Sequence, residues 1–214
     1  MNSLIGKVPD GWSQAALGDL CEILPGPSGD RMPSRAPEPG DVPVVAPRDF
    51  RDNRIVRGNS AVPPGVAKNL GRYRLAIGDV VCARTGELGR QALVGPEQEG
   101  WLVGTACLRL RVFERVSGSF LIYYLGHPSV RTWILANSSG SVIRSLNKET
   151  LRSLPVVCPP AREQEEIVGI LCALDRKIAI HAEIGMATSR LRDSLLPMLM
   201  SDENIPGRSS GHTA

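Results

Sequence analysis

Residues 154–167 read LPVVCPPAREQEEI, and this stretch decides how the chain is organised. Residues 154–158 have the composition of a short strand, and Pro159 and Pro160 cannot continue a helix or a sheet. The helix that follows opens with carboxylates at residues 162–166, where the positive end of the helix dipole favours them. Apolar residues then recur at helical spacing, at Ile167, Ile170, Leu171, Leu174 and Ile178. This pattern predicts a long spacer or docking helix attached to the end of a globular domain.

The length and hydropathy of the chain indicate one globular core. With 214 residues, of which 42% are hydrophobic, the chain is long enough for one well-packed core and an appendage. Its strongly apolar runs, such as residues 120–125, are far shorter than the roughly 20 residues that cross a bilayer. Residues 1–11 also lack the apolar stretch of a signal peptide, so we expect a cytoplasmic protein.

The cysteines show no metal-binding pattern. They are scattered along the chain with no pair at the spacing of metal ligands, and each has apolar neighbours in the sequence. We therefore expect free, buried thiols and no zinc site, and no motif requires a cofactor. The cysteines are Cys21, Cys82, Cys107, Cys158 and Cys172.

Positive charge is concentrated in the first half of the chain. The net charge is only +3, but residues 31–74 contain nine arginines and lysines against four acids. A basic surface that faces an acidic partner, such as a phosphate backbone, explains this excess. A solvated, arginine-rich loop surface explains it equally well.

The order of local patterns indicates an α+β fold. Residues 42–45 form a short apolar strand, and residues 80–84 and 90–94 are β-rich runs whose glycine-containing link predicts a hairpin. Residues 108–113 alternate apolar residues with two arginines, as in a half-buried strand. Helical patterns follow, with Ser119 as the expected cap of residues 120–125, Pro128 at the start of a second helix and Asn147 as the cap of a short turn. We expect a β-rich domain over residues 1–158, a helical arm over 159–200, which Pro197 ends, and a disordered tail over 201–214.

Several short motifs resemble those of a known family. Residues 17–20 (LGDL), 40–50 (GDVPVVAPRDF) and 78–89 (GDVVCARTGELG) are similar to the ordered landmarks of a target-recognition domain. The run from Leu154 through the two prolines to Ile167 resembles the junction between that domain and its helical spacer. The family is the DNA-specificity subunit of type I restriction-modification systems. The resemblance covers roughly residues 11–200, and the junction is its most specific part.

The resemblance implies a recognition protein without catalysis of its own. In this family two recognition domains are held apart by an antiparallel pair of long helices, and each reads half of a bipartite DNA sequence. The helices also dock the methyltransferase subunits, and a restriction subunit is a further partner. One recognition domain and one helix make about half of such a subunit. The resemblance therefore implies either a homodimer or pairing with a second half-subunit.

The candidate DNA contacts fall in three segments. In residues 84–90, two guanidinium groups and a hydroxyl at the tip of a hairpin can grip guanine or phosphate, although an ordinary exposed turn is equally plausible. The arginines near residue 50 suit phosphate contacts, and a polar loop from residue 137 supplies further donors or is a simple linker. The candidates are Arg48, Arg51, Arg54, Arg84, Thr85, Arg90, Ser139, Arg144 and Lys148.

The arm helix carries two apolar stripes. A continuous helix over residues 162–196 would be roughly 52 Å long. Two residues separate the stripes, which turns them about 200° apart, so they face different partners. We expect one to pack on the recognition domain or a methyltransferase subunit and the other on the same helix of a second copy; a helix folded back on its own domain is the alternative. The partner-facing candidates are Ile167, Leu171, Leu174, Ile178, Ile184, Leu191 and Leu195.

Two other functional classes fit the sequence less well. Asp10 with Asp175 and Lys177 satisfies only a sparse pattern for metal-dependent phosphodiester cleavage, and a pattern this permissive is weak. A helical module that binds protein instead of DNA is the stronger alternative. Salt-sensitive retention on DNA would separate that alternative from a DNA-binding subunit, because phosphate contacts release counterions.

Overall fold

The computed structural model describes residues 2–56, 58–140 and 143–200. Its contacts divide the chain into two compact units, Met1–Gly169 and Ile170–Ala214. Each unit is described by itself. The predicted tail, residues 201–214, lies outside the described residues.

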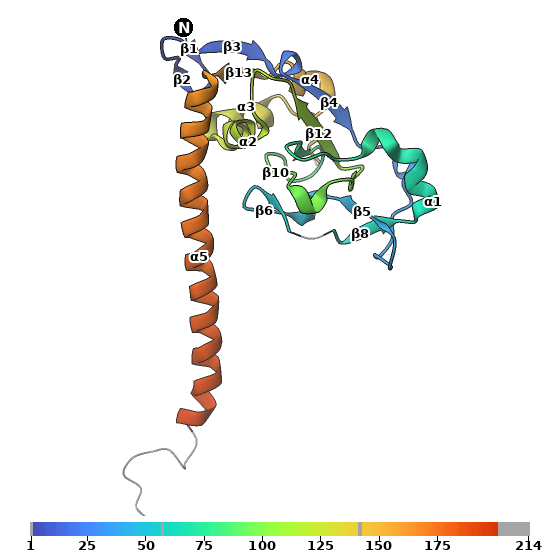
Figure 1. Cartoon of the computed structure of the whole chain (residues 1–214), viewed down its shortest axis with the longest axis vertical. Coiled ribbons are helices and arrows are strands. Elements are labelled where there is room, and N and C mark those ends of the chain that lie inside the picture. The colour runs from blue at the N-terminus through green and yellow to red at the C-terminus, as the bar shows by residue number, and fades with distance from the viewer. Residues whose placement is uncertain (1, 57, 141–142, 201–214) are drawn as a thin grey trace, which may run out of the picture. The chain divides into compact units, whose positions relative to one another are not determined.

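The first unit has the mixed α and β composition that the sequence predicts (Figure 1). Its strands are β1 (Asn2–Ser3), β2 (Gly6–Lys7), β3 (Ser13–Ala16), β4 (Cys21–Pro25), β5 (Val42–Val45), β6 (Phe50–Arg51), β7 (Arg54–Ile55), β8 (Ser60–Val62), β9 (Val80–Ala83), β10 (Gln91–Leu93), β11 (Leu102–Val103), β12 (Cys107–Val112) and β13 (Pro155–Cys158). Its helices are α1 (Pro64–Ala67), α2 (Gly118–Gly126), α3 (Pro128–Ala136) and α4 (Lys148–Arg152), together with the first turns of α5 (Ala161–Leu199).

The strands form one large and three small sheets. The six-stranded sheet has the order β4-β12-β9-β10-β7-β6, and β9 and β10 make the predicted antiparallel hairpin, with Gln91 opposite Cys82. The three-stranded sheet has the order β11-β5-β8, and β1 pairs with β2. Strand β13 pairs antiparallel with β3, so Val156 lies opposite Ala15. Figure 1 shows the β3–β13 pair at one end of this unit and β5, β6 and β8 at the other.

The short helices begin at polar caps. The Asn147 side chain accepts from the Thr150 backbone N–H at the start of α4, as predicted, and Pro128 occupies the first turn of α3. His127 accepts from the Ser129 N–H, which gives this histidine a capping role. Helix α2 is capped by Ser117, which accepts from the Phe120 N–H, and not by Ser119. Gly118 and Ser119 are already helical, so the helix begins before the apolar run that the sequence analysis used to place it.

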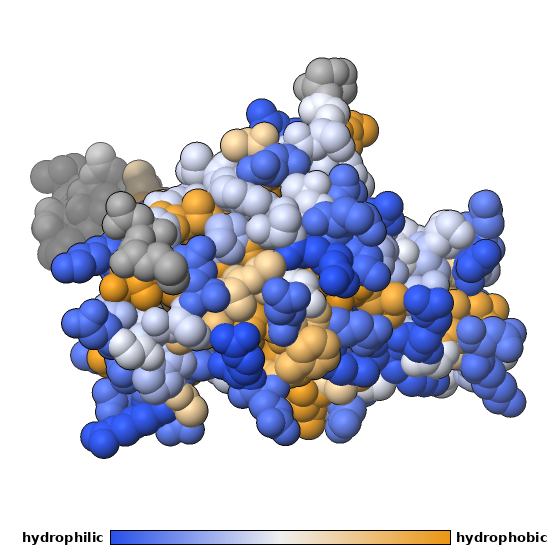
Figure 2. All heavy atoms as spheres, turned by 90° about the horizontal axis from the view of Figure 1, so that it is seen from above, coloured by the Kyte–Doolittle hydropathy of each residue, from blue (hydrophilic) through white to orange (hydrophobic). Residues whose placement is uncertain are grey.

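The core of the first unit lies where helices α2, α3 and α4 meet the six-stranded sheet. Helix α2 contacts β9 and β10, and its apolar side chains, such as Leu121 and Leu125, are fully buried. Trp12, Trp101 and Trp133 are partly buried against the hydrophobic clusters, as expected of core residues. Figure 2 shows a face on which hydrophilic side chains surround smaller apolar areas.

Strand β12 differs in part from its prediction, because its arginine face is buried at Arg109, whereas the Arg111 side chain remains 41% exposed. Arg109 is only 3% exposed, and its guanidinium donates to the carbonyl oxygens of Arg72 (2.9 Å) and Arg74 (3.0 Å) and to the Glu22 carboxylate (2.8 Å). Burial lowers the pKa of Arg109, whereas the hydrogen bonds from Arg111 to Asp79 raise the pKa of Arg111. Apolar residues and arginines do alternate along β12, but the segment around residue 73 covers Arg109.

Helix α5 runs through residues 161–199, with Pro197 inside its last turn. The helix therefore ends within residues 159–200, and it accommodates Pro197 because this proline removes only one hydrogen bond near a terminus. In the second unit, residues from Ile170 onward are exposed almost without interruption. Cys172 is among them, contrary to the prediction of five buried thiols, whereas the other four cysteines are buried. Within the described segments, no helix combines the length and hydrophobicity needed to cross a membrane.

Candidate nucleic-acid interface

The loop between β9 and β10 is anchored, not free. The Gly86 N–H donates to the Arg144 carbonyl (3.1 Å), and the Leu146 N–H donates to the Arg84 carbonyl (2.8 Å). Thr85 forms an antiparallel bridge with Ser145, which bridges in turn to Ser139. Two candidate segments that are separate in the sequence, residues 84–90 and 137–148, therefore lie side by side.

Glycines shape this loop and bring a further arginine next to it. Gly86 and Gly89 have φ angles of +81° and +86°, the left-handed region that residues with a Cβ rarely adopt. A Cβ placed on Gly89 would lie 3.1 Å from the Arg131 Nε. Arg131 is an exposed residue of α3, and sequence reasoning missed it because a single arginine on a short helix carries no local signal.

Arg90 joins the loop to the next hairpin. Its guanidinium donates to the Phe50 carbonyl on β6 (2.5 Å) and to the Glu87 carboxylate (3.0 Å). The Leu93 N–H donates to the Asn53 carbonyl (2.9 Å), so the β6–β7 hairpin is held against β10 from both ends. Arg90 is therefore engaged in contacts within the protein, and much of its hydrogen-bonding capacity is already used.

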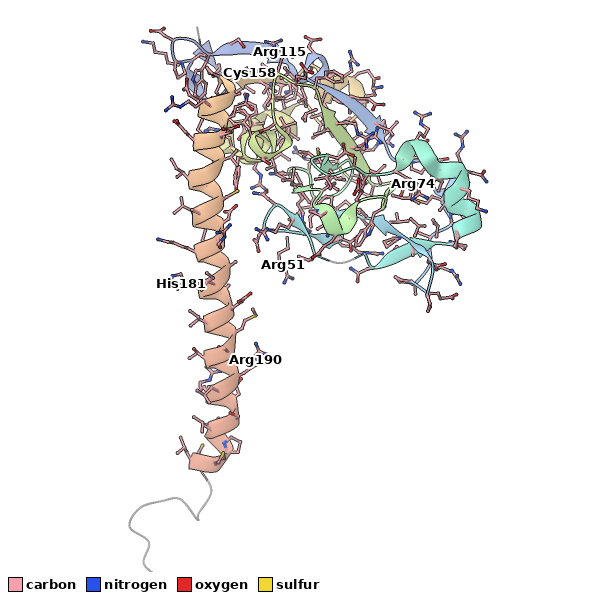
Figure 3. The ribbon with its side chains drawn as sticks, in the orientation of Figure 1. Arg51, Arg74, Arg115, Cys158, His181 and Arg190 are labelled. Atoms are coloured by element: carbon pink, nitrogen blue, oxygen red, sulfur yellow. The ribbon has the colours of Figure 1, made fainter. Side chains whose placement is uncertain are left out.

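The β6–β7 hairpin presents two arginines together. Arg51 and Arg54 are opposite each other in the strand register, and both are exposed. Figure 3 shows where Arg51 lies. The turn between them places Asp52 and Asn53 at φ angles of +49° and +60°, a conformation that these two residue types tolerate better than most. Within the described part of the chain, neither arginine side chain makes a hydrogen bond or an ion pair, so both guanidinium groups remain available to a ligand.

These contacts link the segments that carry most of the candidates, and we call this set of residues the basic face. It consists of Arg51, Arg54, Arg84, Arg90, Arg131 and Arg144, together with Thr85 and Ser139. Arg84 is partly buried, and its Nε has no partner among the described residues. Arg144 is exposed and donates to the Leu135 carbonyl (2.8 Å). Lys148 follows this segment as the first residue of α4 and is partly buried.

Arg48 belongs to a different neighbourhood. Its guanidinium donates to the Ser60 hydroxyl of β8 (2.5 Å), and among the described residues no hydrogen bond links it to the loop at residues 84–90. The adjacent Asp49 is fully buried, where its carboxylate accepts from the Ala46 N–H (2.8 Å) and the Asn59 side chain (2.6 Å). The acidic neighbour of Arg48 is therefore a structural residue that fixes the turn after β5.

The sparse nuclease pattern finds no support in the arrangement of side chains. Asp10 is exposed in the first unit, and Asp175 belongs to the second. Over residues 2–56, 58–140 and 143–200, no three or more histidine, cysteine, aspartate or glutamate side chains are grouped to hold a metal ion.

Known proteins resemble this chain over most of its length. The family described as the type I restriction modification DNA specificity domain matches residues 9–186. A Methanocaldococcus jannaschii protein named for the specificity subunit of the type I restriction enzyme MjaX is 25% identical over 180 residues, which are 81% of this chain and 42% of that protein.

Solved structures share the fold. A chain from a study of assembly and conformational transition in a type I R-M system aligns with a TM-score of 0.67 at 20% identity, over 94% of this chain and 48% of that one. The HsdS subunit from Thermoanaerobacter tengcongensis aligns with a TM-score of 0.60 at 18% identity, over 94% and 47%. The S subunit from M. genitalium aligns with a TM-score of 0.62 at 17% identity, over 95% and 50%. The chain thus spans about half the length of these relatives.

These matches confirm the family resemblance that residues 154–167 and the motifs at residues 17–20, 40–50 and 78–89 indicated. They also agree with the predicted α+β fold that ends in a long helix. Because the family match covers residues 9–186, well over half of the sequence, this chain belongs to the type I restriction modification DNA specificity domain family.

Proposed function

We propose that this chain selects a sequence in duplex DNA and directs partner methyltransferase subunits to it, as a specificity subunit. Family membership carries the proposal, because DNA specificity is the property for which the family is described. The basic face supports it, since it places several cationic side chains around one anchored loop. A restriction subunit would be a further partner of the same complex, which would act in the cytoplasm, and no cofactor is assigned to this chain.

The basic face offers two kinds of contact. Arg84, Thr85 and Arg90 lie on the anchored loop, and an arginine held there can read guanine through two hydrogen bonds. Arg51 and Arg54 are exposed on a short hairpin and suit phosphate oxygens, which receive most protein contacts to DNA. Arg48, Ser139, Arg144 and Lys148 would add contacts along the same duplex. Arg131 joins this set because it lies beside Gly89.

The arm helix would supply the connection to a second recognition unit. Ile167 packs against the core of the first unit, whereas Ile178, Ile184 and Leu191 are each more than half exposed. Exposed apolar residues of this kind mark a surface that another protein covers. We propose antiparallel pairing with the helix of a second copy, through Ile184, Leu191 and Leu195. Leu171, Leu174 and Ile178 would then face a methyltransferase subunit.

A binding experiment tests the DNA-contact proposal. Retention of the purified chain on duplex DNA should fall steeply as salt rises, and Arg51→Ala with Arg54→Ala should lower the slope of log affinity against log salt by about 2, because each lost phosphate contact lowers it by about 1. The matched control is Arg115→Ala, an exposed arginine that Figure 3 shows at the opposite end of the first unit from Arg51. Equal slopes for the wild type and the double variant would reject the assigned contacts. Retention that ignores salt would favour a module that binds protein.

A second experiment tests the division of labour between subunits. The purified chain alone should neither methylate nor cut DNA. Added methyltransferase subunits should methylate a defined sequence only when the chain is present. Methylation or cleavage by the chain alone would overturn the proposal.

A further inference from the structure

Gln164 differs from the other described residues of helix α5 in its burial. It is only 4% exposed, and it is the one residue of this helix that is fully buried among those described. Its neighbours Arg162 and Glu165 are exposed. A polar side chain is costly to bury unless its hydrogen bonds are made, so its burial calls for a specific reason.

The amide of Gln164 is hydrogen-bonded at both ends. Its Oε1 accepts from the Ser117 N–H (2.9 Å), and its Nε2 donates to the carbonyl oxygens of Arg115 (3.0 Å) and Pro159 (2.9 Å). These partners lie in the loop before α2 and at the end of β13, all within the first unit. One side chain therefore ties the helix base to two backbone segments.

Other contacts hold the same two helical turns. The Trp12 indole N–H donates to the Glu163 carboxylate (2.8 Å), which links the helix base to the segment before β3. One turn later, Ile167 and Val168 pack against the main hydrophobic cluster. The base of α5 is thus held by polar contacts in its first turn and by apolar contacts one turn later on the same face.

The chemistry of these contacts explains why a glutamine is required. Only a side-chain amide of this length offers an acceptor and a doubly donating nitrogen in one plane. A glutamate would place acceptor oxygens against two carbonyl groups, and a leucine would leave the Ser117 N–H and the Arg115 and Pro159 carbonyl groups without this partner. Loss of these hydrogen bonds is unfavourable, above all at the buried Pro159 carbonyl, so either change would favour a shift of the helix base.

We infer that Gln164 is a positioning residue that sets the gap length between the two half-sites that a pair of these chains would read. The inference rests on the proposed function, in which the helix spaces two recognition units. A tilt of about 10° at the base displaces a point about 50 Å along a helix by about 9 Å, which exceeds two base-pair steps of about 3.4 Å. The hydrogen bonds of Gln164 would therefore restrict recognition to one spacing between the two half-sites.

The experiment measures directly the length of the gap between the two half-sites. The full chain, combined with its methyltransferase subunits, methylates a library of DNA with randomised sequence, and sequencing identifies the methylated sites. The wild type should yield two blocks of bases separated by one gap length. Gln164→Leu and Gln164→Glu should keep the same bases in each block but accept two or more gap lengths. Glu165→Gln, an exposed neighbour, is the matched control and should behave as the wild type.

Each outcome of this test decides the inference. A single unchanged gap in both folded Gln164 variants, or altered bases within a block, would overturn it. If thermal unfolding shows that the Gln164 variants do not fold, Trp12→Phe replaces them, since it removes only the hydrogen bond to Glu163 and should also broaden the gap. A single gap with Trp12→Phe would then overturn the inference. A wild type that reads one block of bases, with no second block, would instead reject the pairing of two chains and the inference with it.

Discussion

The two units use the same apolar residue types in opposite ways. In the first unit Leu121 is fully buried, whereas in the second Leu191 is 57% exposed. The first unit folds around its own core, while the described part of the second is a helix whose apolar residues are largely exposed. Because helices in proteins are stabilised mainly by packing of an apolar face, the second unit is the part whose stability should depend on a partner.

The contrast between the two units is tested most directly by replacing one leucine in each unit with alanine. Leu121→Ala should destabilise the first unit by about 2–5 kcal/mol, because it removes buried contacts and leaves a cavity. Leu191→Ala should change the free energy of unfolding by less than about 0.5 kcal/mol at a protein concentration too low for pairing. Chemical denaturation followed by circular dichroism measures both. Equal losses in the two variants would mean that the helix is covered by its own chain.

A second prediction concerns association. Leu191→Asp combined with Leu195→Asp should raise the dimer dissociation constant by about 100-fold or more, equivalent to about 2.7 kcal/mol, because pairing would bury two carboxylates without partners. Analytical ultracentrifugation at micromolar concentration measures the effect. Arg192→Ala, between the two leucines and exposed, is the matched control. A wild-type monomer, with and without methyltransferase subunits, or a dimer that survives both aspartates, would count against pairing through this stripe.

The smallest expected effect lies in cysteine reactivity. Burial raises the pKa of the Cys21 thiol to about 12 and raises those of Cys82 and Cys107 further, so few of these groups are thiolate near neutral pH. Cys172 is exposed on α5 and should be alkylated first. Pairing of the helices should slow its alkylation severalfold between dilute and concentrated protein. Mass spectrometry after timed alkylation resolves the sites, and early modification of Cys82 would contradict the burial argument.

Local signals in the sequence predicted much of the fold. The β9–β10 hairpin, the capping of α4 by Asn147 and the start of α5 after Pro160 all follow from residues within a few positions of each other. Burial of Arg109 and Gln164 did not follow, because all but one of their hydrogen-bond partners are 35 to 87 positions away in the sequence. Residue-level burial of polar groups depends on tertiary contacts that short-range periodicity does not encode.

The candidate site was predictable in its parts but not in its assembly. Residues 84–90 and 137–148 stood out by composition, yet only the bridges from Ser145 to Thr85 and to Ser139 show that they are neighbours. The same holds for Arg90, whose bond to the Phe50 carbonyl unites two hairpins. Arg131 could be found only through its proximity to Gly89.

The pairing of β3 with β13 has a consequence for how this unit can be handled as a module. Because β1 and β3 both contact β13, the first and last strands of the first unit lie together, and Trp12 links this region to the base of α5 through Glu163. A domain whose first and last strands are adjacent can be transferred to another scaffold by cutting the chain at two neighbouring points. The sheet formed by β3 and β13 then stays intact. Such a domain is also suited to circular permutation, since a short linker would connect its two ends.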